Sequence, residues 1–97
     1  MEKKTENLLL FISMIDHKAG MPRGTYVTEE CSELIKELMK LERNKGNIGN
    51  VVEESCDVLL TIYTYLLSLG VSFDEIEKII QYKADRTVFR YLAGEEK

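Results

Sequence analysis

The sequence predicts an all-α fold, with four helices in a single domain that spans residues 1–97. Apolar residues recur at three- and four-residue spacing in four segments, which is the period of a helix with one buried face. Glycine-containing stretches separate these segments, and no segment alternates apolar and polar residues as a strand does. A length of 97 residues suits one domain, and 44% hydrophobic with 31% charged residues is typical of a folded globular protein.

The first two helices are expected at residues 3–18 and 26–43. The apolar face of the first helix is formed by Leu8, Phe11, Ile12 and Ile15. The core-facing positions of the second helix are Leu34, Ile35, Leu38 and Leu41. We expect Gly20 to end the first helix, and Thr25 or Thr28 to cap the second.

The third helix is expected between a loop at residues 44–50 and Leu69, with Asn47 or Asn50 as its N-cap. Its apolar residues point in many directions, so it needs cover on all sides. Four helices of this size leave little room to enclose one of them completely, and we therefore expect a homo-oligomer, at least a dimer. The residues expected at the interface are Leu59, Tyr63, Leu66 and Leu67.

The fourth helix has the clearest start signal. Ser72 and Glu75 form a capping box, and the helix is expected to continue to about Tyr91. Its second half carries the basic residues Lys83, Arg86 and Arg90.

Charge and cysteine content exclude several function classes. The net charge of −4 argues against a nucleic acid polymer or an anionic membrane as the main partner. Cys31 and Cys56 lie in no zinc pattern, and His17 is the single histidine. We expect both cysteines to be reduced, buried packing residues. No leader segment is recognisable, and the apolar stretch at 58–69 is too short to span a bilayer, so a cytoplasmic location is expected.

Two acidic motifs carry the chemical signal. They are Glu29-Glu30-Cys31-Ser32-Glu33 and Glu53-Glu54-Ser55-Cys56-Asp57. Acids three residues apart share a helical face, so Glu30 pairs with Glu33 and Glu54 pairs with Asp57. Glu37 continues the first stripe by one turn. If the second and third helices pack antiparallel, both pairs meet near one end of the bundle.

Carboxylates held together in this way repel one another, and partial burial makes each charge costlier. Mg²⁺ would resolve the conflict, because it is a hard cation that takes oxygen ligands and completes its shell with water and substrate phosphates. Two pairs on facing helices would suit more than one such ion. Acidic residues at this spacing also lie on solvated helix faces, so the residues alone leave a metal site and a solvated surface both open.

The motifs resemble those of the MazG-type nucleotide pyrophosphohydrolases, an all-α NTP pyrophosphatase superfamily whose pattern is EExxE followed by ExxD. The resemblance covers about residues 20–91 and implies a MazG-like four-helix bundle that forms dimers or tetramers. It implies hydrolysis of a nucleoside or deoxynucleoside triphosphate to the monophosphate and pyrophosphate. The Mg²⁺ ligands that it implies, with Mn²⁺ as a substitute ion, are Glu30, Glu33, Glu54 and Asp57.

Two further roles belong to the same interpretation. Glu33 or Glu37 would accept the proton of the attacking water. The substrate phosphates would be bound by Lys83, Arg86 and Arg90. The alternative for the basic residues is a purely electrostatic role near a helix C-terminus, where cations favour the helix dipole.

Other functions remain open on the sequence alone. One is a non-catalytic module of the same fold that binds a nucleotide or a partner, and a weaker one is a structural oligomerising bundle. Within the superfamily, a branch that acts on phosphoribosyl-ATP is ranked below NTP hydrolysis. Its Ser-Tyr-Thr segment is only faintly matched by Gly24-Thr25-Tyr26, which lies too close to the first acidic motif.

Overall fold

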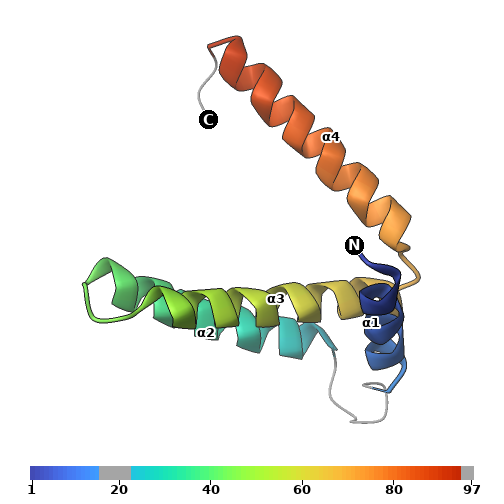
Figure 1. Ribbon diagram of the computed structural model, residues 1–97, viewed down its shortest axis with the longest axis horizontal. Helices are drawn as coiled ribbons and strands as arrows, with labels where there is room; N and C mark the ends of the chain where they lie inside the picture. The colour runs from blue at the N-terminus through green and yellow to red at the C-terminus, as the bar shows by residue number, and fades with distance from the viewer. Residues whose placement is uncertain (16–22, 95–97) are drawn as a thin grey trace.

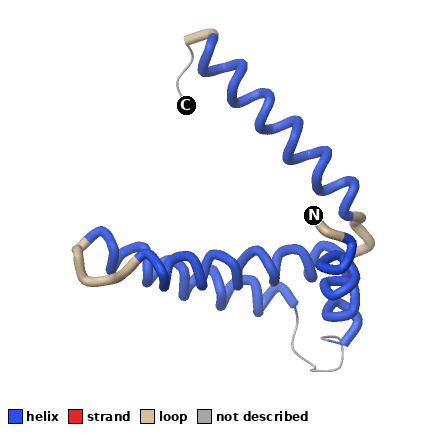
Figure 2. The backbone as a smooth tube through the Cα atoms, in the orientation of Figure 1, coloured by secondary structure: helices blue, strands red, loops and turns tan. Residues whose placement is uncertain are grey.

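Four helices form the part of the chain that the computed structural model describes, residues 1–15 and 23–94 (Figure 1). Their bounds are α1 Lys3–Ile15, α2 Arg23–Glu42, α3 Ile48–Ser68 and α4 Phe73–Leu92. No strand occurs within these described ranges, and the tube in Figure 2 shows short loops from α2 to α3 and from α3 to α4. The predicted all-α fold with four helices is confirmed.

The second and third helices, α2 and α3, lie side by side as an antiparallel hairpin. The backbone reverses at Asn44, whose φ of 60° is left-handed. The amides of Lys45 and Gly46 both donate to the carbonyl of Lys40, at 2.9 and 3.2 Å. A Cβ on Gly46 would lie 3.0 Å from Lys40 Cβ, so the chain needs glycine at this crossing. Asn47 then caps α3, as expected, because its side chain accepts from the Asn50 amide at 2.8 Å.

The start of α2 differs from the prediction. The helix begins at Arg23, three residues before the expected start at Tyr26. Thr25 and Thr28 therefore lie inside the helix, and neither caps it. The Thr28 hydroxyl donates to the Gly24 carbonyl at 2.9 Å, which is a bond available only to a threonine with a helical turn before it. At the end of the first helix, the predicted residues 16–18 and the stop at Gly20 lie outside the described residues.

The buried core lies where α1 crosses the end of the hairpin and packs on α3 (Figure 1). Leu9 of α1 and Val58 of α3 are buried, and so is Ile76 in the first turn of α4. The buried hydroxyl of Thr64 bonds to backbone carbonyls of its own helix, so burial leaves it satisfied. This core is small, since large apolar side chains remain exposed on all four helices.

The last helix, α4, departs from the rest of the structure. Its start matches the prediction, because Ser72 and Glu75 form a complete capping box. The Phe73 ring lies 6.0 Å from the Tyr63 ring, and Ile76 is buried. From Glu77 to Gly94 every residue is exposed, and Figures 1 and 2 show the helix extending away from the hairpin.

The overall dimensions reflect this departure. The radius of gyration is 16.2 Å, whereas a compact chain of this length has about 12.5 Å. The accessible surface is 7474 Å², against about 5,700 Å² for a folded monomer of this mass. None of the described helices combines the length and the apolarity needed to cross a membrane.

Candidate metal centre

Three carboxylates from the two hairpin helices converge. Glu30 comes from α2, and Glu54 and Asp57 come from successive turns of α3. One oxygen of each lies within 4.8 Å of the other two. Glu30 and Glu54 are half-buried, and Asp57 is exposed. We call these three residues the carboxylate triad.

The triad lies toward the middle of the hairpin, not near one end as expected. Glu30 is in the first half of α2, and Glu54 and Asp57 are in the first half of α3. Both helices continue for several turns beyond the acidic motifs, so antiparallel packing places the motifs centrally. The convergence itself follows the prediction, because three-residue spacing puts Glu54 and Asp57 on one side of α3.

Glu54 is the member of the triad whose charged form is destabilised by its surroundings. Burial raises the pKa of Glu54 above its usual 4.5, and the nearby charges of Asp57, Glu30, Glu33 and Glu37 raise it further. Its Oε1 is buried and has no hydrogen-bond partner among the described residues. An acceptor in this state is stabilised by a cation, which would remove both the repulsion and the unmet bond.

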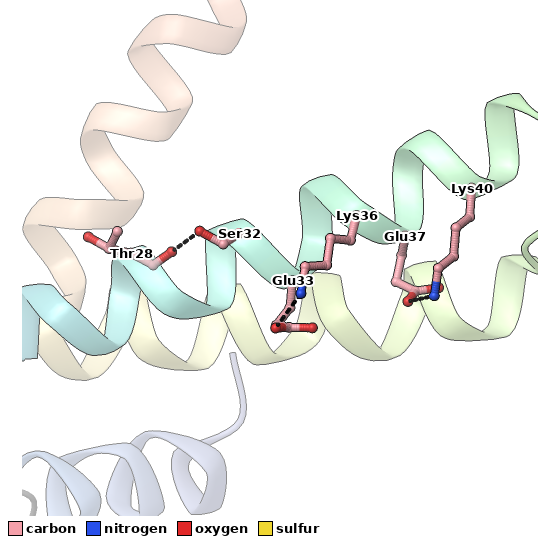
Figure 3. A network of polar contacts seen from close by, with 6 residues as sticks. All are labelled: Thr28, Ser32, Glu33, Lys36, Glu37 and Lys40. Atoms are coloured by element: carbon pink, nitrogen blue, oxygen red, sulfur yellow. Dashed lines mark hydrogen bonds and ion pairs between the residues drawn. The ribbon is translucent and has the colours of Figure 1, made fainter.

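The other two predicted acids lie along the same side of α2 but outside the triad. Each is paired with a lysine three residues on, which Figure 3 shows. Glu33 Oε2 is 3.5 Å from Lys36 Nζ, and Glu37 Oε2 is 3.3 Å from Lys40 Nζ. The Glu33 side chain is half exposed, whereas that of Glu37 is largely buried and its Oε1 has no partner among the described residues.

These lysines are the neighbours that the sequence interpretation overlooked. Neither Lys36 nor Lys40 was among the residues assigned to the site from the sequence. The signal was present, because a lysine three residues after a glutamate lies on the same helical face. The Glu33–Lys36 pair is exposed and so contributes little to stability, and both lysines offset charge beside the triad.

The cysteines within the motifs differ from each other. Cys31 is half-buried, but Cys56 is exposed, so its predicted burial is wrong. Cys56 directly precedes Asp57 on α3 and is turned by about 100° from it around the helix. His17 lies outside the described residues.

The predicted substrate-binding residues are not beside the triad within one chain. Lys83, Arg86 and Arg90 lie on the exposed part of α4, which extends away from the hairpin (Figure 1). The Arg86 guanidinium lies over the Tyr82 ring, 5.6 Å from its centroid. A cis role for these cations at the triad therefore needs a different position of α4.

The spacing of the triad suits one hard divalent cation. Oxygens on opposite sides of Mg²⁺ are about 4.2 Å apart, and about 4.8 Å apart on Ca²⁺. Oxygens that lie within 4.8 Å of one another need only small rotamer adjustments to bind such an ion. All three ligands are oxygens, which excludes the nitrogen and sulfur set of a structural zinc site.

Comparison with known proteins places the chain in a family. A family model described as phosphoribosyl-ATP pyrophosphohydrolase matches residues 13–84, which include both acidic motifs and the start of α4. No curated protein and no solved structure matched the chain. The matched family is a member of the MazG-like all-α superfamily that the acidic motifs resemble. The match covers well over half of the chain, and the chain belongs to the phosphoribosyl-ATP pyrophosphohydrolase family.

Proposed function

We propose that the chain is a Mg²⁺-dependent pyrophosphohydrolase that cleaves nucleoside or deoxynucleoside triphosphates into a monophosphate and pyrophosphate. The observation that carries the proposal is the carboxylate triad, in a chain that belongs to a pyrophosphohydrolase family. The unpartnered Oε1 of Glu54 supports it, because the site is poorly satisfied without a cation.

The triad residues Glu30, Glu54 and Asp57 would hold the ion, with Glu33 entering the shell through a change of rotamer. When bound there, Mg²⁺ supplies polarisation of the phosphate oxygens and neutralises their charge. Glu33 and Glu37 are the proposed proton acceptors for the attacking water. Both lie beside the triad, since both raise the pKa of Glu54.

Attack is proposed at the α-phosphorus, so that pyrophosphate leaves in one piece. Lys36 and Lys40 hold one oxygen each of Glu33 and Glu37. The Glu33 side chain is half exposed, whereas Oε1 of Glu37 is buried, so Glu33 is the acceptor that bulk water reaches more easily. Lys83, Arg86 and Arg90 are the proposed phosphate ligands. A homo-oligomer and a cytoplasmic location are parts of the same proposal.

A second candidate substrate is phosphoribosyl-ATP, which the sequence interpretation ranked lower. The specific observation in its favour is the description of the matched family. Phosphoribosyl-ATP carries the same triphosphate, so the same residues would cleave the same type of bond. The two candidates differ only in what the protein binds beyond the phosphates.

The test is a substrate panel assayed for pyrophosphate release. The full chain is incubated with Mg²⁺ and, separately, with canonical NTPs, dNTPs, modified nucleotides and phosphoribosyl-ATP, with and without EDTA. Release from NTPs or dNTPs that EDTA abolishes supports the first candidate, and release from phosphoribosyl-ATP alone supports the second. Metal binding without release from any member would point instead to a non-catalytic nucleotide-binding module.

A further inference from the structure

Two lysines of α2, Lys36 and Lys40, reach back along their helix toward the acidic residues of the hairpin (Figure 3). Their ammonium groups are 3.5 Å from Glu33 and 3.3 Å from Glu37. The charges of both of these acids act on Glu54 of the carboxylate triad. Since the two lysines are four residues apart, they lie on successive turns of one helical face. The hairpin itself therefore supplies two cations beside the candidate metal centre.

In each of these ion pairs the lysine is the more exposed partner. The Lys36 side chain is 66% exposed, and that of Glu33 is 51% exposed. The Lys40 side chain is 49% exposed, and that of Glu37 is only 14% exposed. The carboxylates are thus more deeply buried than the lysines that pair with them. An anion that approaches this part of the hairpin from solvent meets the lysine side chains before the glutamates.

Both ion pairs are long enough to exchange partners. Strong hydrogen bonds between charged nitrogen and oxygen atoms are about 2.7–2.9 Å long, and both pairs here exceed that length. The Glu33–Lys36 pair is also exposed on both sides and contributes little to stability. A polyphosphate carries several charged oxygens, so it can replace a glutamate as the partner of an ammonium group.

The charge of the acidic cluster explains why such cations matter. The cluster consists of five carboxylates, those of Glu54 and of its acidic neighbours Glu30, Glu33, Glu37 and Asp57. When all five are ionised, the two lysines bring the formal charge from −5 to −3, and one Mg²⁺ would bring it to −1. Without the lysines, the site with one Mg²⁺ would keep a charge of −3 and repel a polyphosphate more strongly.

We propose that Lys36 and Lys40 bind the phosphates of the nucleotide, and that each exchanges its glutamate for a phosphate oxygen when the substrate binds. This inference rests on the proposed function and adds two cations of the hairpin to those of α4. The exchange would release Glu33, which could then turn toward the metal ion or accept a proton from water. An ammonium group is a compact charge with three donors, so it can bind phosphate oxygens of both the substrate and the pyrophosphate product.

The first test follows the lysines of the unaltered protein. A limiting amount of an amine-acetylating reagent, followed by mass spectrometry, measures how fast each lysine reacts. With Mg²⁺ and inorganic pyrophosphate, Lys36 and Lys40 should react several-fold more slowly than with Mg²⁺ alone. Lys45 and Lys78 are exposed and pair with none of the five carboxylates, so their rates should not change. Equal rates at Lys36 and Lys40 with and without pyrophosphate would overturn the proposal.

The second test measures the affinity for pyrophosphate by isothermal titration calorimetry in the presence of Mg²⁺. Lys36→Met with Lys40→Met keeps the apolar stems of both side chains and removes both charges. The Kd should rise by about tenfold or more, because hydrogen bonds to charged groups contribute this much. Lys36→Arg with Lys40→Arg keeps both charges and should bind pyrophosphate nearly as well as the unaltered chain.

The matched control is Lys45→Met with Lys78→Met, which removes the same charge elsewhere and should keep the affinity for pyrophosphate. An equal loss in this control would show that net charge alone matters, and the proposal would fail. If Lys36 and Lys40 serve only to neutralise the carboxylates, their replacement should strengthen Mg²⁺ binding and leave the affinity for pyrophosphate unchanged. That result would also overturn the proposal.

The outcomes separate this proposal from the proposed function. Pyrophosphate binding that depends on Lys36 and Lys40, without pyrophosphate release from any nucleotide, supports the role of the lysines and refutes the proposed function. Pyrophosphate release from a nucleotide with an unchanged KM in the Lys36→Met, Lys40→Met variant supports the proposed function and refutes the role of the lysines.

Discussion

The α2–α3 hairpin and α4 are built from equally clear local signals but end in opposite situations. Asn47 caps the start of α3, and a capping box starts α4. The hairpin helices pack on each other and bring three carboxylates together, whereas α4 stays exposed from Glu77 onward. Local sequence thus determines where a helix begins, and the partner surface determines what its faces do.

The largest expected effect comes from removing one carboxylate of the triad in the hairpin. Glu54→Gln should lower kcat/KM by at least about 100-fold, since even residues that only support a metal ligand contribute 10- to 100-fold. Glu53→Gln is the matched control, because Glu53 is adjacent and exposed but outside the triad. Steady-state pyrophosphate release measures both variants. Equal losses in the two would mean that general acidity of the surface matters and the triad does not.

The rise in Tm caused by a metal ion tests metal binding by the hairpin without any substrate. At about 100 times its Kd, a ligand of the native state stabilises by about 2.7 kcal/mol. For a chain of this size that corresponds to a rise in Tm of roughly 10–20 °C. Mg²⁺ or Mn²⁺ should produce this rise in thermal melts of the unaltered chain. Glu54→Gln with Asp57→Asn should abolish it.

Glu29→Gln with Glu53→Gln removes the same amount of charge from the same two motifs outside the triad. This control should keep the full metal response. An unchanged rise in the Glu54/Asp57 double variant would place the ion elsewhere on the chain.

Most of the local structure was predictable from the sequence. The Ser72 and Asn47 caps and the meeting of Glu30 with Glu54 and Asp57 all followed from spacing. The early start of α2 was missed, because threonine was read as a cap although it also bonds back to a carbonyl inside a helix. The burial of Cys56 was wrong, because residue type was given more weight than its direction on α3.

The direction in which α4 extends could not be predicted from the sequence, for a different reason. Periodicity identifies the apolar face of a helix but not the surface that covers it. The basic residues were therefore placed on α4, but the position of α4 relative to the hairpin could not be predicted.

The two caps provide a smaller, matched comparison. Asn47→Ala and Ser72→Ala should each lower the free energy of unfolding by about 1 kcal/mol. Urea unfolding followed by circular dichroism measures both. If α4 is covered in the assembled protein, the two losses will be similar. A loss confined to Asn47→Ala would show that α4 unfolds separately from the hairpin.

The smallest effect is the dependence on pH in the absence of metal. Because the pKa of Glu54 is raised above 4.5, the carboxyl group of Glu54 binds its proton more tightly in the folded chain than in the unfolded chain. The contribution of Glu54 to stability should therefore fall as pH rises from about 4.5 through the raised pKa, and then stay constant. Tm in EDTA, compared between the unaltered chain and Glu54→Gln across this range, isolates the contribution.

The same titration should act on the metal response in the opposite sense. The metal binds the carboxylate form, so the Mg²⁺-induced rise in Tm should shrink as pH falls through the raised pKa of Glu54. If the difference between the unaltered chain and Glu54→Gln is independent of pH, Glu54 does not titrate in this window.

The position of the new bond tests the central claim most directly. The full chain hydrolyses its best substrate with Mg²⁺ in ¹⁸O-labelled water, and mass spectrometry locates the label. Attack at the α-phosphorus beside the carboxylate triad predicts the label in the monophosphate and unlabelled pyrophosphate. Label in the pyrophosphate, or release of inorganic phosphate and a diphosphate, would contradict the account.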